Sequence, residues 1–207
     1  MLFEIRGIKI KLGFGFAAVV TLMLLFCETE IALISFASSV AHETGHIACL
    51  LFFGVKPEYI SLGFFGMRME CRGESRLDYL RDALFLLSGA AVNVFLAFAS
   101  AAFFFTGCMT VKYIFSVNAV IAAFNLLPVE ALDGGKALYL FLCRTGEREK
   151  ADRIIAITSY LTVAFLTCFG IYLYLCGVLS VSFAAVTGYL ILQTVFSVKT
   201  QRKDKQG

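Results

Sequence analysis

The only two histidines of the chain lie four residues apart, in the segment HETGH. On a helix, His42 and His46 would project from one face about a turn apart, where two imidazole nitrogens can bind one metal ion. Glu43 would then lie beside the open position of that metal. Zinc lowers the pKa of a bound water, and a neighbouring carboxylate can take its proton during attack on a peptide carbonyl. The segment therefore predicts a hydrolytic Zn2+ site with Glu43 as the general base.

Chance is a poor account of this segment. Two randomly placed histidines would fall four apart, with a glutamate after the first, in roughly 1 of 1000 sequences of this kind. A purely structural role is also disfavoured, because ionisable residues inside an apolar membrane span are costly and tend to face a bundle interior or a water-filled cavity. The metal site is the stronger interpretation.

A catalytic zinc site needs a third protein ligand besides the two histidines. The chain has no other histidine, so the ligand must be a carboxylate or a cysteine near the end of a membrane helix. The residues that qualify are Glu130, Asp133, Cys49 and Cys143. Asp133 also fits the cap of a helix beginning at DGGKALYLFL, so the residues alone leave the choice open.

The composition indicates that these residues are positioned by membrane helices. Hydrophobic residues make up 59% of the chain and charged residues 16%, against roughly 25% charged residues in soluble domains. Apolar runs close to a bilayer crossing recur along the chain. They predict an all-α polytopic membrane protein, a single domain over residues 1–207. The six expected transmembrane helices cover residues 12–27, 31–54, 83–105, 113–128, 154–174 and 177–197.

Two segments depart from continuous helix. The alternation of apolar residues between 55 and 72 predicts a small strand pair after the second helix. In NLLPVEALDGGK, Asn125, Pro128, Gly134 and Gly135 all disfavour helix. Irregular backbone at membrane depth is tolerated where it is buried in protein or lines a water-filled cavity, so this segment is expected to form a cavity wall.

The distribution of positive charge predicts the orientation in the lipid bilayer. With six spans, 17 of the 18 Lys and Arg residues fall on one side and only Lys112 on the other. Cytoplasmic loops retain positive charge, so the N-terminus and the C-terminus are both expected in the cytoplasm. The net charge of +3 gives no reason to expect a nucleic acid partner, because the positive residues lie in the connections on one side of the membrane spans.

HETGH in the second span, followed by NLLPVEALDGGK after the fourth, resembles the site-2 protease family of intramembrane metalloproteases, peptidase family M50. Its pattern is HExxH followed by Asn, Pro and LDGG. The resemblance implies that His42, His46 and Asp133 bind zinc and that Glu43 is the base. It further implies that Asn125 and Pro128 contact substrate.

A third motif, SGAAVN, resembles the family's third span and implies Asn93 as a further substrate contact. It departs from the family at Ala90, where proline is frequent. The chain looks most like the small six-span members that act in bacterial sporulation. We expect a minimal catalytic core without a PDZ or CBS domain.

The resemblance implies cleavage of a membrane-associated protein substrate near the cytoplasmic face of a bacterial cell membrane. A sigma-factor precursor would be such a substrate, and regulatory membrane proteins would be further partners. The alternative is a zinc-binding scaffold or transporter without proteolysis. Metal binding alone does not require a carboxylate directly after the first histidine, so Glu43 favours the enzyme.

Overall fold

The structure is a computed structural model that describes residues 2–5, 8–12, 29–55, 57–63, 66–71, 79–177, 183–184 and 186–194. Before residue 29 and from 57 to 71 it describes the backbone only. The chain divides into two compact units, Met1–Ala123 and Phe124–Gly207. The prediction of a single domain stays a prediction.

The first unit contains a four-stranded sheet in the order β1-β2-β3-β4. Its strands are β1 Leu2–Ile5, β2 Ile8–Leu12, β3 Pro57–Gly63 and β4 Gly66–Cys71. The β2–β3 pair is parallel, and the two outer pairs are antiparallel. This sheet is larger than the expected pair. The two additional strands, β1 and β2, come from the residues before the first expected span, where no strand was expected. The expected span at 12–27 lies outside the described residues beyond Leu12.

The helices of the first unit begin earlier than the sequence analysis expected. They are α2 Thr29–Phe52, α3 Tyr79–Ala101 and α4 Met109–Asn125, with a short 3-10 turn at Phe104–Thr106 before α4. Expected boundaries were set at charged residues, but Arg81 and Asp82 lie within the first turn of α3. At its other end α2 stops at Gly54, whose φ of 75° is left-handed and unfavourable for other residues.

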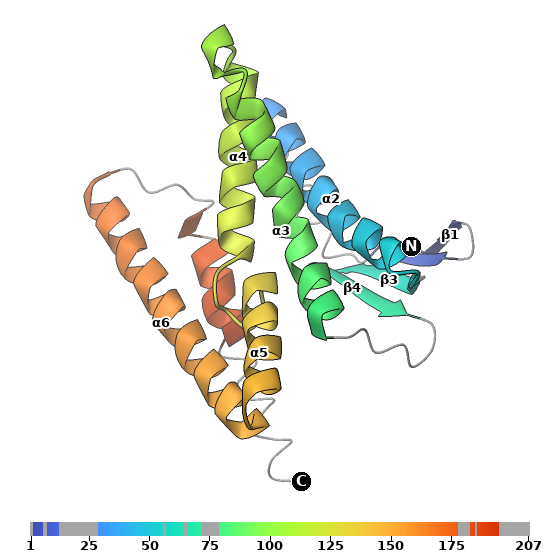
Figure 1. Ribbon diagram of the computed structural model, residues 1–207. Helices are drawn as coiled ribbons and strands as arrows, with labels where there is room; N and C mark the ends of the chain where they lie inside the picture. Colours follow the sequence, from blue (N-terminus) through green and yellow to red (C-terminus); the bar gives the residue numbers. More distant parts are fainter. Residues whose placement is uncertain are drawn as a thin grey trace. The chain divides into compact units, whose positions relative to one another are not determined.

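α2 and α3 pack closely side by side (Figure 1). The contact is made by small residues, as in many membrane helix pairs. A Cβ added at Gly45 of α2 would lie 2.8 Å from Val92 Cγ2 and 2.9 Å from the Ser88 carbonyl oxygen of α3. Since His42 and His46 lie on either side of this contact along α2, it brings both histidines against α3.

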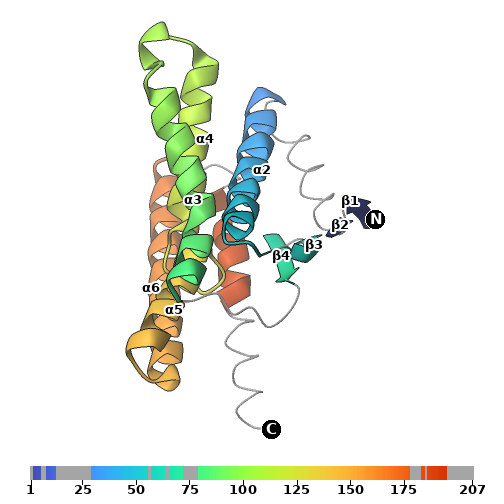
Figure 2. The same cartoon turned by 45° about the vertical axis from the view of Figure 1, so that its right-hand side comes forward.

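The second unit contains α5 Asp133–Thr145 and α6 Arg148–Leu175, which run beside each other (Figure 2). Residues 183–184 and 186–194 are also helical. The core of the unit joins the turn before α5, α6 and the last helical segment through Val129, Val163, Leu166 and Leu190. No membrane span was expected between residues 128 and 154, and a helix beginning at DGGKALYLFL was considered only as an alternative role for Asp133; α5 is that helix.

A half-buried hydrogen bond joins α5 to the start of α6. The Tyr139 hydroxyl donates to Asp152 Oδ1 at 3.0 Å. Burial raises the pKa of Tyr139 above its ordinary value, and hydrogen bonds with Cys143 and Asp152 act in the same direction. The phenol therefore stays protonated at neutral pH and keeps the start of α6 against α5.

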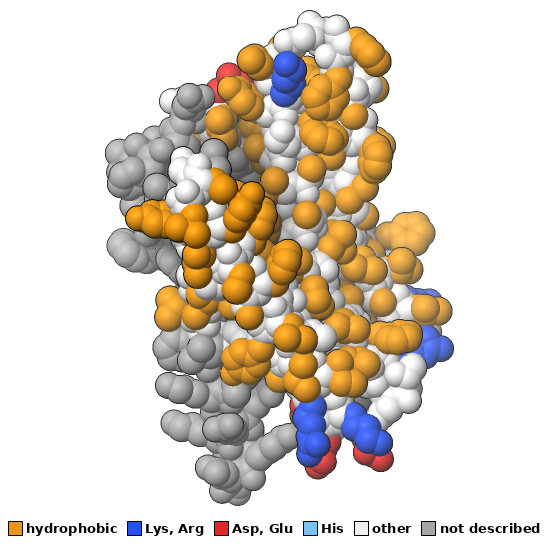
Figure 3. All heavy atoms as spheres, turned by 90° about the vertical axis from the view of Figure 1, so that its left-hand side faces the viewer, with side chains coloured by type: hydrophobic (Ala, Val, Ile, Leu, Met, Phe, Trp, Pro, Cys, Tyr) orange, Lys and Arg blue, Asp and Glu red, His pale blue; other side chains and the backbone are white. Residues whose placement is uncertain are grey.

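Helix composition indicates a membrane protein. Among the described helices, α3 and α6 are long and apolar enough to cross a bilayer, and α4 is a shorter apolar helix. Large apolar side chains are exposed on both long helices, including Phe95 at 69%, Phe98 at 73% and Phe165 at 68%. On the face drawn in Figure 3, hydrophobic side chains predominate over charged ones. The count of six spans stays a prediction.

Candidate metal centre

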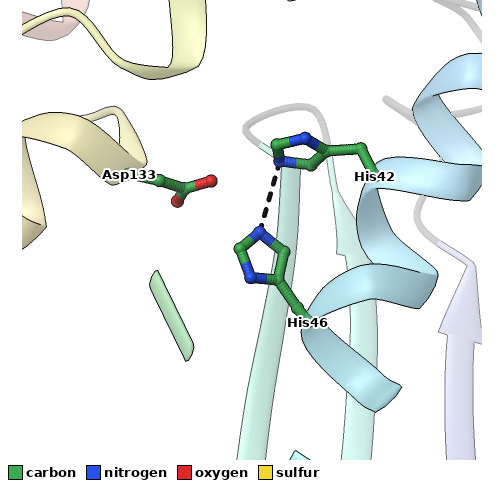
Figure 4. Close-up of side chains that lie close together, drawn as sticks. All are labelled: His42, His46 and Asp133. Atoms are coloured by element: carbon green, nitrogen blue, oxygen red, sulfur yellow. Dashed lines mark hydrogen bonds between the residues drawn. The ribbon is translucent and has the colours of Figure 1, made fainter. Parts of the chain in front are cut away.

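The two histidines come together on one face of α2. His42 and His46 are each only 5% exposed. Their Nε2 atoms lie 3.2 Å apart (Figure 4), and their rings are nearly perpendicular at 80°. This juxtaposition results from the four-residue spacing on a helix, since one turn separates the two side chains.

The opposite nitrogen of each ring contacts α3. His42 Nδ1 lies 2.7 Å from Asn93 Oδ1, and His46 Nδ1 lies 2.7 Å from the carbonyl oxygen of Phe85. Because a carbonyl oxygen can only accept, the Phe85 contact requires the proton on His46 Nδ1. The Asn93 oxygen likewise places the proton of His42 on Nδ1. Each Nε2 then has a lone pair for a metal ion, as in metal sites where outer partners fix the histidine tautomer.

The separation of the two Nε2 atoms fits zinc. Zn–N bonds of about 2.0–2.1 Å at a tetrahedral angle place two nitrogen ligands about 3.3–3.4 Å apart. The observed 3.2 Å is close to that value. Because oxygens of Asn93 and Phe85 hold both protons on Nδ1, neither Nε2 has a proton to donate, so the pair is a chelating arrangement rather than an ordinary hydrogen bond.

The carboxylates of the two motifs belong to different units. Glu43 is half-buried on α2, next to His42 in the chain. Asp133 is the first residue of α5, and its side chain is 13% exposed. The cap of α5 is Leu132, without a side-chain cap bond, so Asp133 does not fill the capping role considered from the sequence. Lys136 Nζ lies 3.1 Å from Asp133 Oδ1.

The other residues weighed as third ligand have contacts of their own. Glu130 is half-buried in the turn before α5, where its backbone N–H donates to Ser159 Oγ at 3.0 Å. The Cys143 thiol is hydrogen-bonded to Tyr139, and both cysteines considered are half-buried. Cys49 lies on α2 beyond His46.

Part of the chain matches the model of a known protein family. Residues 104–169 match the model of peptidase family M50, and they include α4, the LDGG segment and most of α6. Over these residues the chain is similar to peptidase family M50. The resemblance to this family that the sequence motifs indicated is therefore confirmed.

Two curated proteins are similar to this chain over part of their length. Stage IV sporulation protein FB of Bacillus subtilis is 28% identical over 130 residues, which are 61% of this chain and 45% of that protein. The "Putative zinc metalloprotease sll0528" of Synechocystis is 32% identical over 127 residues, which are 58% of this chain and 33% of that protein. The matched region thus spans less than half the length of either relative.

One solved structure shares the fold. The Site-2 Protease from Methanocaldococcus jannaschii matches with a TM-score of 0.64 over 94% of this chain and 93% of that structure. The two sequences are 22% identical in this match. The mostly helical architecture described here is therefore shared with that structure.

The glycine pair of the segment LDGG has a steric reason. A Cβ at Gly134 would strike the backbone of Leu126, and a Cβ at Gly135 would strike the Val129 carbonyl. Pro128 lacks an N–H and cannot continue α4, so the chain turns sharply and α5 begins against the turn. The two glycines let α5 start so close to the end of α4, which fixes Asp133 at the first position of α5.

The structure places the three proposed substrate contacts in different surroundings. Asn125 ends α4, and Pro128 follows in the turn; both are half-buried. Asn93 is fully buried on α3, with its side-chain oxygen against His42.

Two further polar residues adjoin Asn93 and were missed by the sequence analysis. They are Ser38 of α2 and Asn118 of α4, both almost completely buried. The signal was present in the sequence, because polar residues inside an apolar span tend to be functional. Asn118 is such a residue in the expected span 113–128.

Gly89 of α3 keeps the space beside the two Nε2 atoms open. A Cβ at this position would strike His46 Nε2 and would lie 2.7 Å from His42 Nε2. We expect Gly89→Ala to lower zinc affinity by at least about 10–100-fold, the loss typical for disturbing the partners around a metal site. Zinc content and chelator competition on purified protein would measure this effect.

Gly188→Ala is the matched control, because no atom lies within 4 Å of a Cβ at Gly188. It should bind zinc as the wild type does. A folded Gly89→Ala protein with wild-type zinc affinity would show that the space beside the two histidines is not a metal position.

Proposed function

We propose that the chain is an intramembrane zinc metalloendopeptidase that hydrolyses a peptide bond of a membrane-associated substrate near the cytoplasmic face. The observation that carries this proposal is the buried pair on α2, with the two Nε2 atoms 3.2 Å apart and both Nδ1 atoms in contact with α3. A glutamate follows the first of these histidines, which is the arrangement that zinc-assisted hydrolysis requires.

His42, His46 and Asp133 are the proposed zinc ligands. These side chains offer two nitrogens and a carboxylate oxygen, the kind of donor set that catalytic zinc sites use. When bound, zinc would activate a water and polarise the peptide carbonyl. The position of Asp133 at the start of α5, set by the glycine pair, supports its assignment over Glu130.

Glu43 is proposed as the general base. Its carboxylate would accept a proton from the attacking water and later give it to the leaving amine. Its place on α2, directly after His42, keeps the carboxylate close to the two histidines in the chain.

Removal of the metal provides a direct test. The purified protein, treated with a zinc chelator, should lose cleavage of unfolded casein in detergent, and zinc should restore it. The loss should exceed about 100-fold, because the metal supplies both the nucleophile and the electrophilic activation. Cleavage that survives complete zinc removal, verified by elemental analysis, would refute zinc-dependent hydrolysis.

Substrate binding is proposed for two regions. Asn125 and Pro128 lie where helix α4 stops, and this interruption of the helix is proposed to line the path of an extended peptide. β4 is an outer strand of the described sheet, to which such a peptide could add as a further strand. A substrate contact by Asn93 would require its amide to leave His42, so we propose that Asn93 acts on the histidine instead.

The membrane arrangement proposed is multi-pass, in a bacterial cell membrane, with the N-terminus and the C-terminus cytoplasmic. The bias of Lys and Arg to one side supports it.

Thiol labelling of intact cells tests this topology, using variants that keep one cysteine each. Cys108 is exposed, between α3 and α4, on the side expected to be external. A hydrogen bond from the backbone N–H of Val111 lowers the pKa of the Cys108 thiol, with Thr110 adding to the effect, so it should react readily. Cys71 should resist a membrane-impermeant reagent, and labelling of Cys71 from outside would invert the topology.

For the substrate, we propose a sigma-factor precursor processed during sporulation, with membrane proteins as regulators. Similarity to stage IV sporulation protein FB supports this choice. Expression of the chain with sigma-factor precursors of its own genome should yield one shortened at its N-terminus. If none is shortened while casein is cleaved, the sporulation substrate is wrong and the peptidase activity stands.

The alternative is a zinc-binding scaffold or transporter. It would share the ligands and their tautomers, so zinc content does not separate the two proposals. Only the role of Glu43 differs between them, because binding a metal does not require a base. The effect of changing Glu43 therefore decides between enzyme and binder.

A further inference from the structure

A buried polar relay connects α4 to the histidine pair. We use the name amide relay for Ser38, Asn93 and Asn118, which are between 0% and 5% exposed. Asn93 Nδ2 donates to Asn118 Oδ1 at 2.8 Å and to the Ser38 carbonyl oxygen at 3.2 Å. Asn118 Nδ2 donates to the Ile114 carbonyl oxygen at 2.8 Å and to Ser38 Oγ at 3.0 Å.

The relay fixes which way each amide points. Backbone carbonyl oxygens only accept hydrogen bonds, so the amide nitrogens must face Ile114 and Ser38. The oxygen of Asn118 is then directed at Asn93, and the oxygen of Asn93 is directed at His42. Turning Asn93 round would set its oxygen against two other oxygens, those of Asn118 and Ser38, in a site without water contact.

The orientation of Asn93 decides the tautomer of His42. An oxygen 2.7 Å from Nδ1 requires the proton on Nδ1, which leaves Nε2 unprotonated toward His46. A reversed amide would present an N–H to Nδ1 and favour the proton on Nε2, where it would block a metal. The tautomer of His46 does not depend on a side-chain amide, because its Nδ1 contacts the backbone carbonyl oxygen of Phe85.

We propose that Asn118 is a positioning residue for the metal site: through Asn93, it holds His42 in the tautomer that can bind zinc. The inference rests on the proposed zinc site but does not require that the protein cleave peptides. Asn118 does not touch the histidine itself. Its effect passes through one amide, which accepts from His42 on one side and donates to Asn118 on the other.

The two histidines of the chain make the test direct, because 15N-histidine labelling reports on these residues alone. In metal-free protein, at a pH where both rings are neutral, 15N chemical shifts distinguish a protonated Nδ1 from a protonated Nε2. The wild type should show both rings protonated on Nδ1. Asn118→Leu, which removes the acceptor for Asn93, should move a measurable fraction of His42 to the Nε2–H form and leave His46 unchanged.

Zinc affinity gives a second readout. Chelator competition should show about 10–100-fold weaker binding for Asn118→Leu, the range found when a partner of a ligating histidine is lost. In an Asn93→Ala background the same substitution should cost little more, because the connection to His42 is already broken. Ser100→Ala is the matched control: Ser100 is buried on α3 and donates to the Ala97 carbonyl oxygen, outside the relay.

A folded Asn118→Leu protein with the wild-type tautomer of His42 would overturn the proposal. An affinity loss that is undiminished in the Asn93→Ala background would overturn it too. If Asn118→Leu does not fold, Asn118→Ala removes the same acceptor with less steric demand and is judged by the same spectra. A wild type that has both rings protonated on Nδ1 and binds zinc but never cleaves would instead refute the peptidase function and leave the relay intact.

Discussion

Glu43→Gln is expected to keep its zinc and lose peptide hydrolysis by about 10²–10⁴-fold, the usual contribution of a general base. Glutamine has nearly the same size as glutamate, but its amide cannot accept the proton of the attacking water at neutral pH. The two rings are positioned by the contact of His42 with Asn93 and of His46 with the Phe85 carbonyl oxygen, and Glu43→Gln leaves both partners in place. Elemental analysis and casein cleavage on the same purified sample would measure both properties.

Glu30→Gln is the matched control for this experiment. It makes the same substitution on the same helix, in the first turn of α2, where Glu30 is exposed. We expect wild-type cleavage and wild-type zinc from it. A Glu43→Gln protein that retains zinc and cleaves at the wild-type rate would remove the proposed mechanism. If the wild type and both variants bind zinc but cleave no substrate, the scaffold or transporter function gains support.

The sequence was informative where the site depends on local geometry. The spacing of His42 and His46 needs only a helix to bring the two rings together, and helix formation there follows from a long apolar run without proline. The glycines after Asp133 were identified as helix-disfavouring, and the structure adds the backbone atoms that they avoid. The family could be recognised because its motifs are short and carry the chemistry.

The sequence was less informative where the site depends on contacts between helices. Asn93 meets His42 across 51 residues of chain, and Asn118 meets Asn93 across 25. No periodicity specifies which polar residues of three neighbouring spans will face one another, because that depends on how the helices pack. β1 and β2 were missed for the same reason, since a short charged flank becomes a strand only when β3 is available to pair with it.

A single substitution of the proposed third ligand, Asp133, should have a large effect on both zinc binding and cleavage. We expect Asp133→Asn to lower zinc affinity by more than about 100-fold and to abolish cleavage. An amide oxygen is neutral and a poorer zinc ligand than a carboxylate, so the change exceeds the 10–100-fold cost of losing an outer partner. Asp133→Asn would also remove the negative charge that Lys136 contacts at 3.1 Å, and Lys136→Met measures the effect of losing this ion pair separately. Lys136→Met should retain most of the zinc affinity.

Glu130→Gln is the matched control, since it also replaces a carboxylate by its amide, three residues earlier in the turn before α5. The backbone N–H of Glu130 is held by Ser159 whichever side chain is present, so the turn should stay in place. Substantial cleavage and near wild-type zinc are expected. If Glu130→Gln lost its zinc and Asp133→Asn kept both zinc and activity, Glu130 would be the third ligand. Asp133 would then serve only to favour the start of α5, where a negative charge complements the helix dipole.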